Sequence, residues 1–440
     1  MKIKMIAALK SATLLLVSFM TIGTAVIAQL PLVAIKVPAG FNSSLYAEGI
    51  GRARHLVVNK NDKVFVKLER LSKGNGIVEL AESKTPGKAE VINAFASYTG
   101  TGIAIKNGYL YATSNTEVFR YKLNSDMEVI STEPELIVTG LIDRRQHNSK
   151  SIALDNAGNL YVNIGAFSNS CQEKDRQNGS LGMDPCPVLD SAGGIWQFTA
   201  DKLNQTYKDG SRYATGIRNV VGLDWNDEIN ELFVMQHGRD QLGSMFPNVF
   251  DAQKVDELPA EEMFLVKKGM NFGWPYCYYD PIQNKKVLSP EYGGDGKKIG
   301  RCAEMQDPVV AFPAHMAPNA LLFYTGTMFP DRYKNGAFIA FHGSWNRSVN
   351  GQEGYFVAFV PFKGGKPSGK WEIFANGFAG MEKVVSTGDA KYRPCGIAQG
   401  PDGSLYISDD NKGNIWKITY NKNTAANIVG SANNNLATAP

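Results

Sequence analysis

The chain has 440 residues, of which 43% are hydrophobic and 20% charged, and its 46 basic and 42 acidic side chains give a formal charge of +4. This nearly balanced charge argues against a nucleic-acid or acidic-membrane partner. The 44 glycines and the 10% share of aromatic residues fit a protein of strands and turns, and no long segment has the amphipathic period of a major helix.

The N-terminus has the layout of a secretory signal peptide. Lysines in the first ten residues are followed by an apolar run that ends in Val26-Ile27-Ala28. The run is short for a full span, which favours cleavage over the alternative of a membrane anchor. We therefore predict a signal peptide over residues 1–28 and a periplasmic or secreted mature protein without a membrane span. Loss of three lysines would leave 43 basic and 42 acidic residues.

Six segments along the chain repeat one pattern, in which an apolar start leads into a polar turn and then into alternating apolar residues. They cover residues 55–66, 103–113, 152–165, 223–238, 321–344 and 397–410. This is the pattern of a β-hairpin. Their aromatic markers stand about 45–105 residues apart: Phe65, Tyr111, Tyr161, Phe233, Phe338 and Tyr406. Such a period with strand-only content indicates blades carrying insertions. We predict an all-β fold, a six-bladed β-propeller over residues 29–420, followed by a disordered tail over 421–440.

Five cysteines follow the predicted signal peptide. Cys171 and Cys186 bracket one loop, and Cys277 and Cys302 bracket another, so two local disulfides are the economical pairing in an oxidising compartment. Cys395 is left over. No pair has the spacing of a zinc ribbon and the histidines are scattered singly, which argues against a zinc site.

Propellers commonly bind ligands at one mouth of the central channel, where loops from several blades meet. Four loops carry unusual chemistry for connections between strands: 144–151, 215–225 together with 235–240, 340–347, and 391–398. Several cationic side chains at the loop ends of different blades would repel one another, and a bound polyanion would relieve that repulsion.

Together these loops resemble the glucose/sorbosone dehydrogenase family, soluble quinoproteins with a six-bladed propeller that use pyrroloquinoline quinone (PQQ) and calcium. The resemblance runs from about Pro38 to Tyr420. It is carried by the blocks QHNSKSIALDNAGNLYVNIG, TGIRNVVGLDW, QHGRDQL, NFGWP, AHMAP, HGSWNR and YRPCGIAQGPDGSLYISDD. The loop SNSCQEKDRQ with DPCP is more similar to the sorbosone branch than to the glucose branch.

The resemblance implies a reaction centre. His147 corresponds to the general base, which takes the proton of the substrate's anomeric hydroxyl while hydride passes to the quinone. Arg218 and Asn219 correspond to the pair that contacts the quinone, where a cation stabilises developing charge. Should His147 not be the base, His237 and His342 are the alternatives.

The resemblance also implies the groups that hold the cofactors. The backbone carbonyls of Gly238 and Arg239 correspond to the loop that binds calcium, an ion suited to oxygen donors. Arg347, Lys391 and Arg393 correspond to the cations that hold the carboxylates of PQQ.

The chain departs from the glucose branch in three places. Gln146 stands where that branch has an aspartate to orient the base, and Asp143 is a possible substitute. Arg347 lies in a different loop from the lysine of that branch. The branch's polar substrate contact has no clear counterpart around Ser97 to Gly102.

The predicted function is that of a PQQ-dependent dehydrogenase that oxidises a sugar or related aldose at C1 and passes electrons to a quinone or a redox protein. One alternative is a calcium-dependent lactonase or esterase, which would need acidic and amide ligands in the channel. Another is a non-catalytic propeller that binds a protein or a glycan.

Overall fold

The computed structural model describes residues 34–251, 256–347 and 350–421. The predicted signal peptide (1–28) and residues 422–440 of the predicted tail lie outside these ranges. No helix among the described residues is long and apolar enough to cross a membrane.

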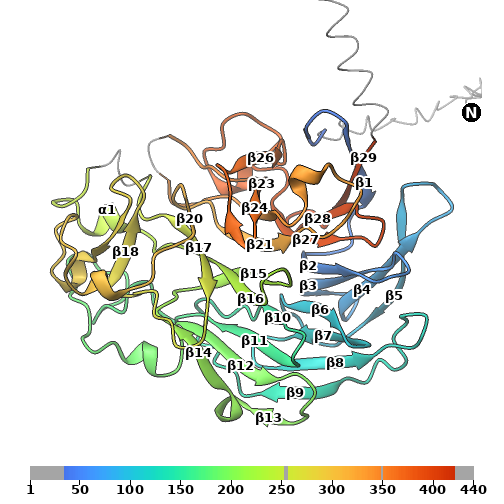
Figure 1. The fold of residues 1–440 in the computed structure, drawn as a ribbon, viewed down its shortest axis with the longest axis horizontal. Coiled ribbons are helices and arrows are strands. Elements are labelled where there is room, and N and C mark those ends of the chain that lie inside the picture. The colour runs from blue at the N-terminus through green and yellow to red at the C-terminus, as the bar shows by residue number, and fades with distance from the viewer. Residues whose placement is uncertain (1–33, 252–255, 348–349, 422–440) are drawn as a thin grey trace, which may run out of the picture. The chain divides into compact units, whose positions relative to one another are not determined.

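The first three blades are antiparallel sheets of four strands in chain order, drawn from blue to green in Figure 1. Blade 1 contains β2 (Ala53–Val58), β3 (Val64–Ser72), β4 (Asn75–Glu82) and β5 (Ala89–Phe95). Blade 2 contains β6 (Ile103–Lys106), β7 (Tyr109–Thr113), β8 (Val118–Lys122) and β9 (Glu135–Thr139), with β13 (Gln205–Thr206) added in parallel. Blade 3 contains β10 (Ile152–Leu154), β11 (Asn159–Ile164), β12 (Gly194–Thr199) and β14 (Ser211–Thr215).

The other three blades follow the same plan. Blade 4 contains β15 (Val220–Asn226), β16 (Glu231–Gln236), β17 (Glu261–Val266) and β20 (Val310–Phe312). Blade 5 contains β21 (Pro318–Phe323), β22 (Ala337–Phe341), β23 (Phe356–Val360) and β26 (Glu372–Ala375). Blade 6 contains β27 (Pro394–Gln399), β28 (Leu405–Asp409), β29 (Ile415–Tyr420) and β1 (Phe41–Ala47). The six-bladed β-propeller is therefore confirmed.

Short elements fill the connections between these strands. The two extra hairpins are β18 (Cys277–Asp280) with β19 (Lys285–Leu288), and β24 (Phe362–Lys363) with β25 (Lys366–Pro367). The α-helix α1 covers Leu242–Met245. The 3-10 helices are η1 (Pro187–Asp190), η2 (Tyr207–Asp209), η3 (Pro290–Tyr292), η4 (Gly300–Glu304), η5 (Asp331–Tyr333) and η6 (Thr387–Asp389).

The six aromatic markers all lie on the second strand of a blade and are at most 2% exposed. Each of these strands pairs on one side with the first strand of its blade, which we call the inner strand, and on the other side with the third strand. Both of its edges are therefore covered. The hairpin pattern of the sequence thus located the buried centre of every blade.

The ring is closed by the N-terminal strand. Strand β1 pairs antiparallel with β29, from Phe41 opposite Tyr420 to Ala47 opposite Ile415. Each inner strand contacts the inner strands of the two adjacent blades, and β2 contacts β27. A cavity of about 310 Å³ lies between these six inner strands and forms the central channel.

Both predicted disulfides form, between Cys171 and Cys186 and between Cys277 and Cys302. Cys395 is a buried free thiol. The first disulfide lies between β11 and β12, and the second closes the long insertion of blade 4 that holds the β18–β19 hairpin.

Candidate active site at one mouth of the channel

The predicted loops meet at one end of the channel, which we call the active-site mouth. In an antiparallel hairpin, the loop before the inner strand and the loop after the second strand lie at the same end. His147, Arg218 and Arg393 stand just before β10, β15 and β27, whereas Gly238 and Arg239 follow β16. Contacts across blades join them, for example Arg393 Nε to the carbonyl oxygen of His342 at 3.1 Å.

His147 is held with one ring nitrogen available. Its Nδ1 lies 2.5 Å from the carbonyl oxygen of Ala166, and a carbonyl can only accept, so Nδ1 carries the proton. The lone pair is therefore on Nε2. The backbone of His147 is left-handed, with φ 51°. A Cβ on Gly165 would lie 2.6 Å from the His147 Cβ, so only glycine allows this close approach.

The surroundings keep the His147 imidazole neutral. Burial, and next the positive charge of Arg218, lower the pKa of His147 from its ordinary 6.5 to about 3. The ring is thus unprotonated at neutral pH, as a general base must be before it accepts a proton.

Gln146 does not orient the base. Its Nε2 donates to Asp175 Oδ2 at 2.8 Å. Asp143 is exposed and accepts a hydrogen bond from the backbone N–H of Arg145 at 3.2 Å. The Ala166 carbonyl, and not a neighbouring carboxylate, therefore orients the His147 ring, and it adds no negative charge.

Arg218 is 2% exposed and its guanidinium binds mainly protein groups. Its Nε donates to the Asn169 carbonyl oxygen at 3.1 Å, and its Nη1 to the Gly238 carbonyl oxygen at 2.9 Å. Its Nη2 donates to Asn169 Oδ1 at 2.9 Å and to Asp240 Oδ2 at 2.7 Å. These contacts occupy four of the five N–H groups, so one remains for a ligand.

Asn219 lies beside the base. A Cβ on Gly165 would meet both His147 and the Asn219 Oδ1, which places the two side chains close together against this glycine. Asn163 Nδ2 contacts Asn219 Oδ1 at 3.4 Å and the Ser149 carbonyl oxygen at 3.3 Å. The structure thus brings together His147, Arg218 and Asn219.

The predicted calcium loop lies against guanidinium groups of the protein. The Gly238 carbonyl already accepts a hydrogen bond from Arg218, and the side chain of Arg239 forms a buried ion pair with Glu291. Among the described residues, no group of three or more His, Cys, Asp or Glu side chains could hold a metal ion.

The three predicted carboxylate-binding cations differ in position. Arg393 is half-buried and donates to the carbonyl oxygens of His342 and Gly343, with N–H groups left over. Lys391 is also half-buried, its Nζ 5.5 Å from the ring centroid of Tyr392. The structure does not bring Arg347 to these two, because its buried guanidinium binds Asp256, Ala314 and Glu257.

Two aspartates of the mouth were missed by the sequence reasoning. Asp240 accepts from Arg218 and from Arg176, and Asn346 Nδ2 donates to its other oxygen at 3.0 Å. Asp410 accepts from His342 Nε2 at 2.7 Å and from Arg54 Nη1 at 2.9 Å. The sequence signal that could have found them is their place in the motifs, because Asp240 is the last residue of QHGRD and Asp410 is the last residue of ISDD.

The closed ring of six blades, with a histidine and arginines gathered at one mouth, defines a β-propeller with a polar ligand site. The chain belongs to the TrAA12-like family, whose model matches residues 35–421.

Proteins of similar sequence or fold support this family assignment. The pyrroloquinoline quinone-dependent sugar dehydrogenase of Hypocrea jecorina is 22% identical over 405 residues, 86% of this chain and 88% of that protein. An uncharacterized protein of Borreliella burgdorferi is 30% identical over 212 residues, so that match spans 48% of each chain. The iodide structure of Trichoderma reesei Carbohydrate-Active Enzymes Family AA12 has a TM-score of 0.71 at 20% identity, covering 89% of this chain and 99% of that one, which shows the shared fold. The closer resemblance to the sorbosone branch stays a prediction.

Proposed function

We propose that the chain is a PQQ-dependent dehydrogenase that oxidises an aldose at C1. The observation that carries the proposal is the neutral His147 imidazole, held by the Ala166 carbonyl so that Nε2 keeps its lone pair. The relationship to the PQQ-dependent sugar dehydrogenase of Hypocrea jecorina supports the cofactor and the class of substrate.

In this proposal, PQQ supplies the two-electron acceptor for the hydride that leaves C1 of the sugar. His147 Nε2 takes the proton of the C1 hydroxyl as the C–H bond breaks, and the sugar leaves as its lactone. The positive charge of Arg218, fixed by Asn169 and Asp240, would then favour the anion-like product of the transfer.

The residues of the mouth fit an anionic, planar cofactor. Arg393 keeps N–H groups for a carboxylate, Arg218 keeps one, and Asn219 offers an amide beside the base. Calcium stays an expectation from the family resemblance, and no step above depends on it. We further propose export from the cytoplasm, since both disulfides need an oxidising compartment, and a quinone or redox protein as the electron acceptor.

The test is reduction of bound PQQ by a C1-deuterated and a protiated aldose in rapid mixing. His147→Ala should lower the rate by about 10²–10⁴-fold while PQQ binding, followed by absorbance titration, stays nearly unchanged. His55→Gln is the matched control, because His55 also contacts a backbone carbonyl, that of Asn319. A wild-type rate in His147→Ala would move the base to His237 or His342, and a wild-type protein that binds no PQQ would overturn the proposal.

A further inference from the structure

A second cavity, of about 230 Å³, lies next to the loop that carries His147. We call it the polar cavity. It is formed by the end of β3 in blade 1, by the loops before β6 and after β7 in blade 2, and by the loop that enters blade 3. The lining residues used below are Glu69, Arg70, Thr101, Asn115, Asn148 and Ser149.

The position of the base links the polar cavity to the reaction centre. Asn148 and Ser149 follow His147 directly in the chain and line the cavity. Asn163 then bridges from the Ser149 carbonyl oxygen to Asn219 Oδ1, which lies near His147 on the cofactor side. The cavity and the groups that would contact PQQ are therefore joined through the segment 147–149.

The cavity wall carries polar groups without partners. Among the described residues, the side chains of Arg70, Asn115 and Asn148 form no hydrogen bond to another group of the protein. Glu69 is exposed, and one of its carboxylate oxygens accepts a hydrogen bond from Arg52 Nη1 at 3.2 Å. A guanidinium, a carboxylate and two amides together supply donors and acceptors, which is what sugar hydroxyls require, since each hydroxyl both donates and accepts.

Two buried lysines hold the backbone of the loops that form the cavity. Lys67 Nζ donates to the Tyr98 carbonyl oxygen at 2.7 Å, and Lys150 Nζ donates to the Asn148 carbonyl oxygen at 2.6 Å. Both lysines are fully buried. In addition, Thr101 Oγ1 contacts Ser149 Oγ at 3.3 Å across the two loops. The backbone of these loops is thus held in place before a ligand arrives, which lowers the entropy cost of binding.

From this geometry we propose that the polar cavity binds the ring hydroxyls of the sugar and so determines which sugars place C1 at His147. The inference rests on the proposed function only for the reaction at C1. Binding of a sugar ring in the cavity is independent of PQQ and can be measured without it.

The probe is 1,5-anhydroglucitol, which has the ring hydroxyls of glucose but no anomeric hydroxyl and cannot be oxidised at C1. Its dissociation constant for the protein without PQQ is measured by calorimetry or by saturation-transfer NMR. We expect Glu69→Gln, Arg70→Gln and Asn115→Ala each to raise this constant about three- to tenfold, the loss of one hydrogen bond. In the PQQ-loaded enzyme, the same variants should raise KM for the aldose by a similar factor and leave kcat within about twofold.

Glu372→Gln and Arg332→Gln are the matched controls, because these residues form an exposed ion pair on blade 5 away from the mouth. The inference is wrong if the probe does not bind, or if it binds all three cavity variants as tightly as the wild type. If probe binding depends on the cavity but His147→Ala keeps the wild-type rate, the cavity stands and the proposed base falls.

Discussion

Arg218 and Arg393 were both predicted to contact PQQ, yet the structure gives them different surroundings. Arg218 lies within a set of protein acceptors that includes the buried carboxylate of Asp240. Although burial acts to raise the pKa of Asp240, the charges of Arg218 and Arg176 hold it well below its ordinary value. Removing Arg218 would leave the Asp240 carboxylate paired with Arg176 alone. Arg393, in contrast, is half-buried at the active-site mouth and donates to two backbone carbonyls.

We therefore expect Arg218→Ala to lower the free energy of unfolding by about 3–5 kcal/mol, the cost of breaking a buried ion pair. Arg393→Ala should cost at most about 1 kcal/mol of stability but weaken PQQ binding about ten- to hundredfold. Urea denaturation and PQQ titration of both variants measure the two effects. A stable Arg218→Ala protein with intact PQQ binding would contradict the arrangement described for Arg218.

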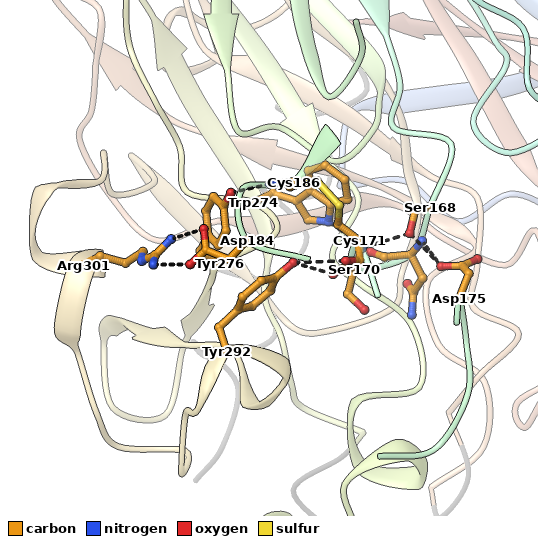
Figure 2. The surroundings of a disulfide bond; sticks show 11 residues. Ser168, Ser170, Cys171, Asp175, Asp184, Cys186, Trp274, Tyr276, Tyr292 and Arg301 are labelled. Carbon is orange, nitrogen blue, oxygen red and sulfur yellow. Dashed lines mark hydrogen bonds and ion pairs between the residues drawn. A yellow bond between two sulfur atoms is a disulfide. The ribbon is translucent and has the colours of Figure 1, made fainter. Parts of the chain in front are cut away.

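At the scale of elements, the loop between β11 and β12 connects the first disulfide to the base. Figure 2 shows Ser168 and Asp175 on one side of Cys171 and Tyr292 on the other. The Tyr292 hydroxyl donates to the Ser170 carbonyl oxygen at 3.1 Å, and Ser168 Oγ donates to Asp175 Oδ1 at 2.7 Å. Trp274 Nε1 donates to the carbonyl oxygen of Asn169, the residue that also holds Arg218. Ala166, whose carbonyl orients His147, belongs to the same loop.

Replacing both Cys171 and Cys186 by Ser should lower stability by about 3 kcal/mol and also weaken PQQ binding, because the loop would no longer fix Asn169. The matched control is the double variant Cys277→Ser with Cys302→Ser. The disulfide that it removes closes a somewhat longer loop, with a separation of 25 residues instead of 15. This control should cost a similar stability with a smaller effect on PQQ. Thermal unfolding and PQQ titration of the two double variants test this, and equal effects on PQQ binding would refute a special function of the first loop.

The elements that could be predicted from the sequence are those with a local signal. Alternating apolar residues around a polar turn marked the second strand of all six blades, from Phe65 in β3 to Tyr406 in β28. Strand β1 was not predicted as the closing strand, because its partner β29 lies at the other end of the chain and no local pattern encodes that pairing. The disulfides were predictable since each closes a short loop.

The candidate site was predictable only in part. Motif order placed His147, Arg218 and Asn219 in one region, but it gave no information on hydrogen-bond partners. That Arg218 is bound by Asn169, that Arg347 is buried against Ala314, and that Ala166 orients the base depend on contacts between residues 19 to 49 positions apart. Sequence patterns of single segments do not report such contacts.

At the scale of the whole molecule, the ring of blades makes every blade depend on its neighbours. The seam in blade 6, where the first strand meets the last, is the point at which the ring can open. Phe41 of β1 lies at this seam, and its ring contacts those of Phe329, Tyr333, Phe374 and Tyr420 at centroid distances of 4.8 to 5.3 Å. These contacts join blade 6 to blade 5, so they stabilise the closed ring and not one sheet alone.

Phe41→Ala should therefore lower the free energy of unfolding by about 2–3 kcal/mol, less than for a fully buried ring because Phe41 is partly exposed. Phe41→Leu, which keeps most of the apolar contact, should cost about 1 kcal/mol. Because opening the seam exposes the edge of β29 and weakens both neighbouring blades, tryptophan fluorescence and far-ultraviolet circular dichroism should shift together to lower urea. If Phe41→Ala left the midpoint unchanged, or if the two signals separated in the wild type, the seam would not govern the stability of the ring.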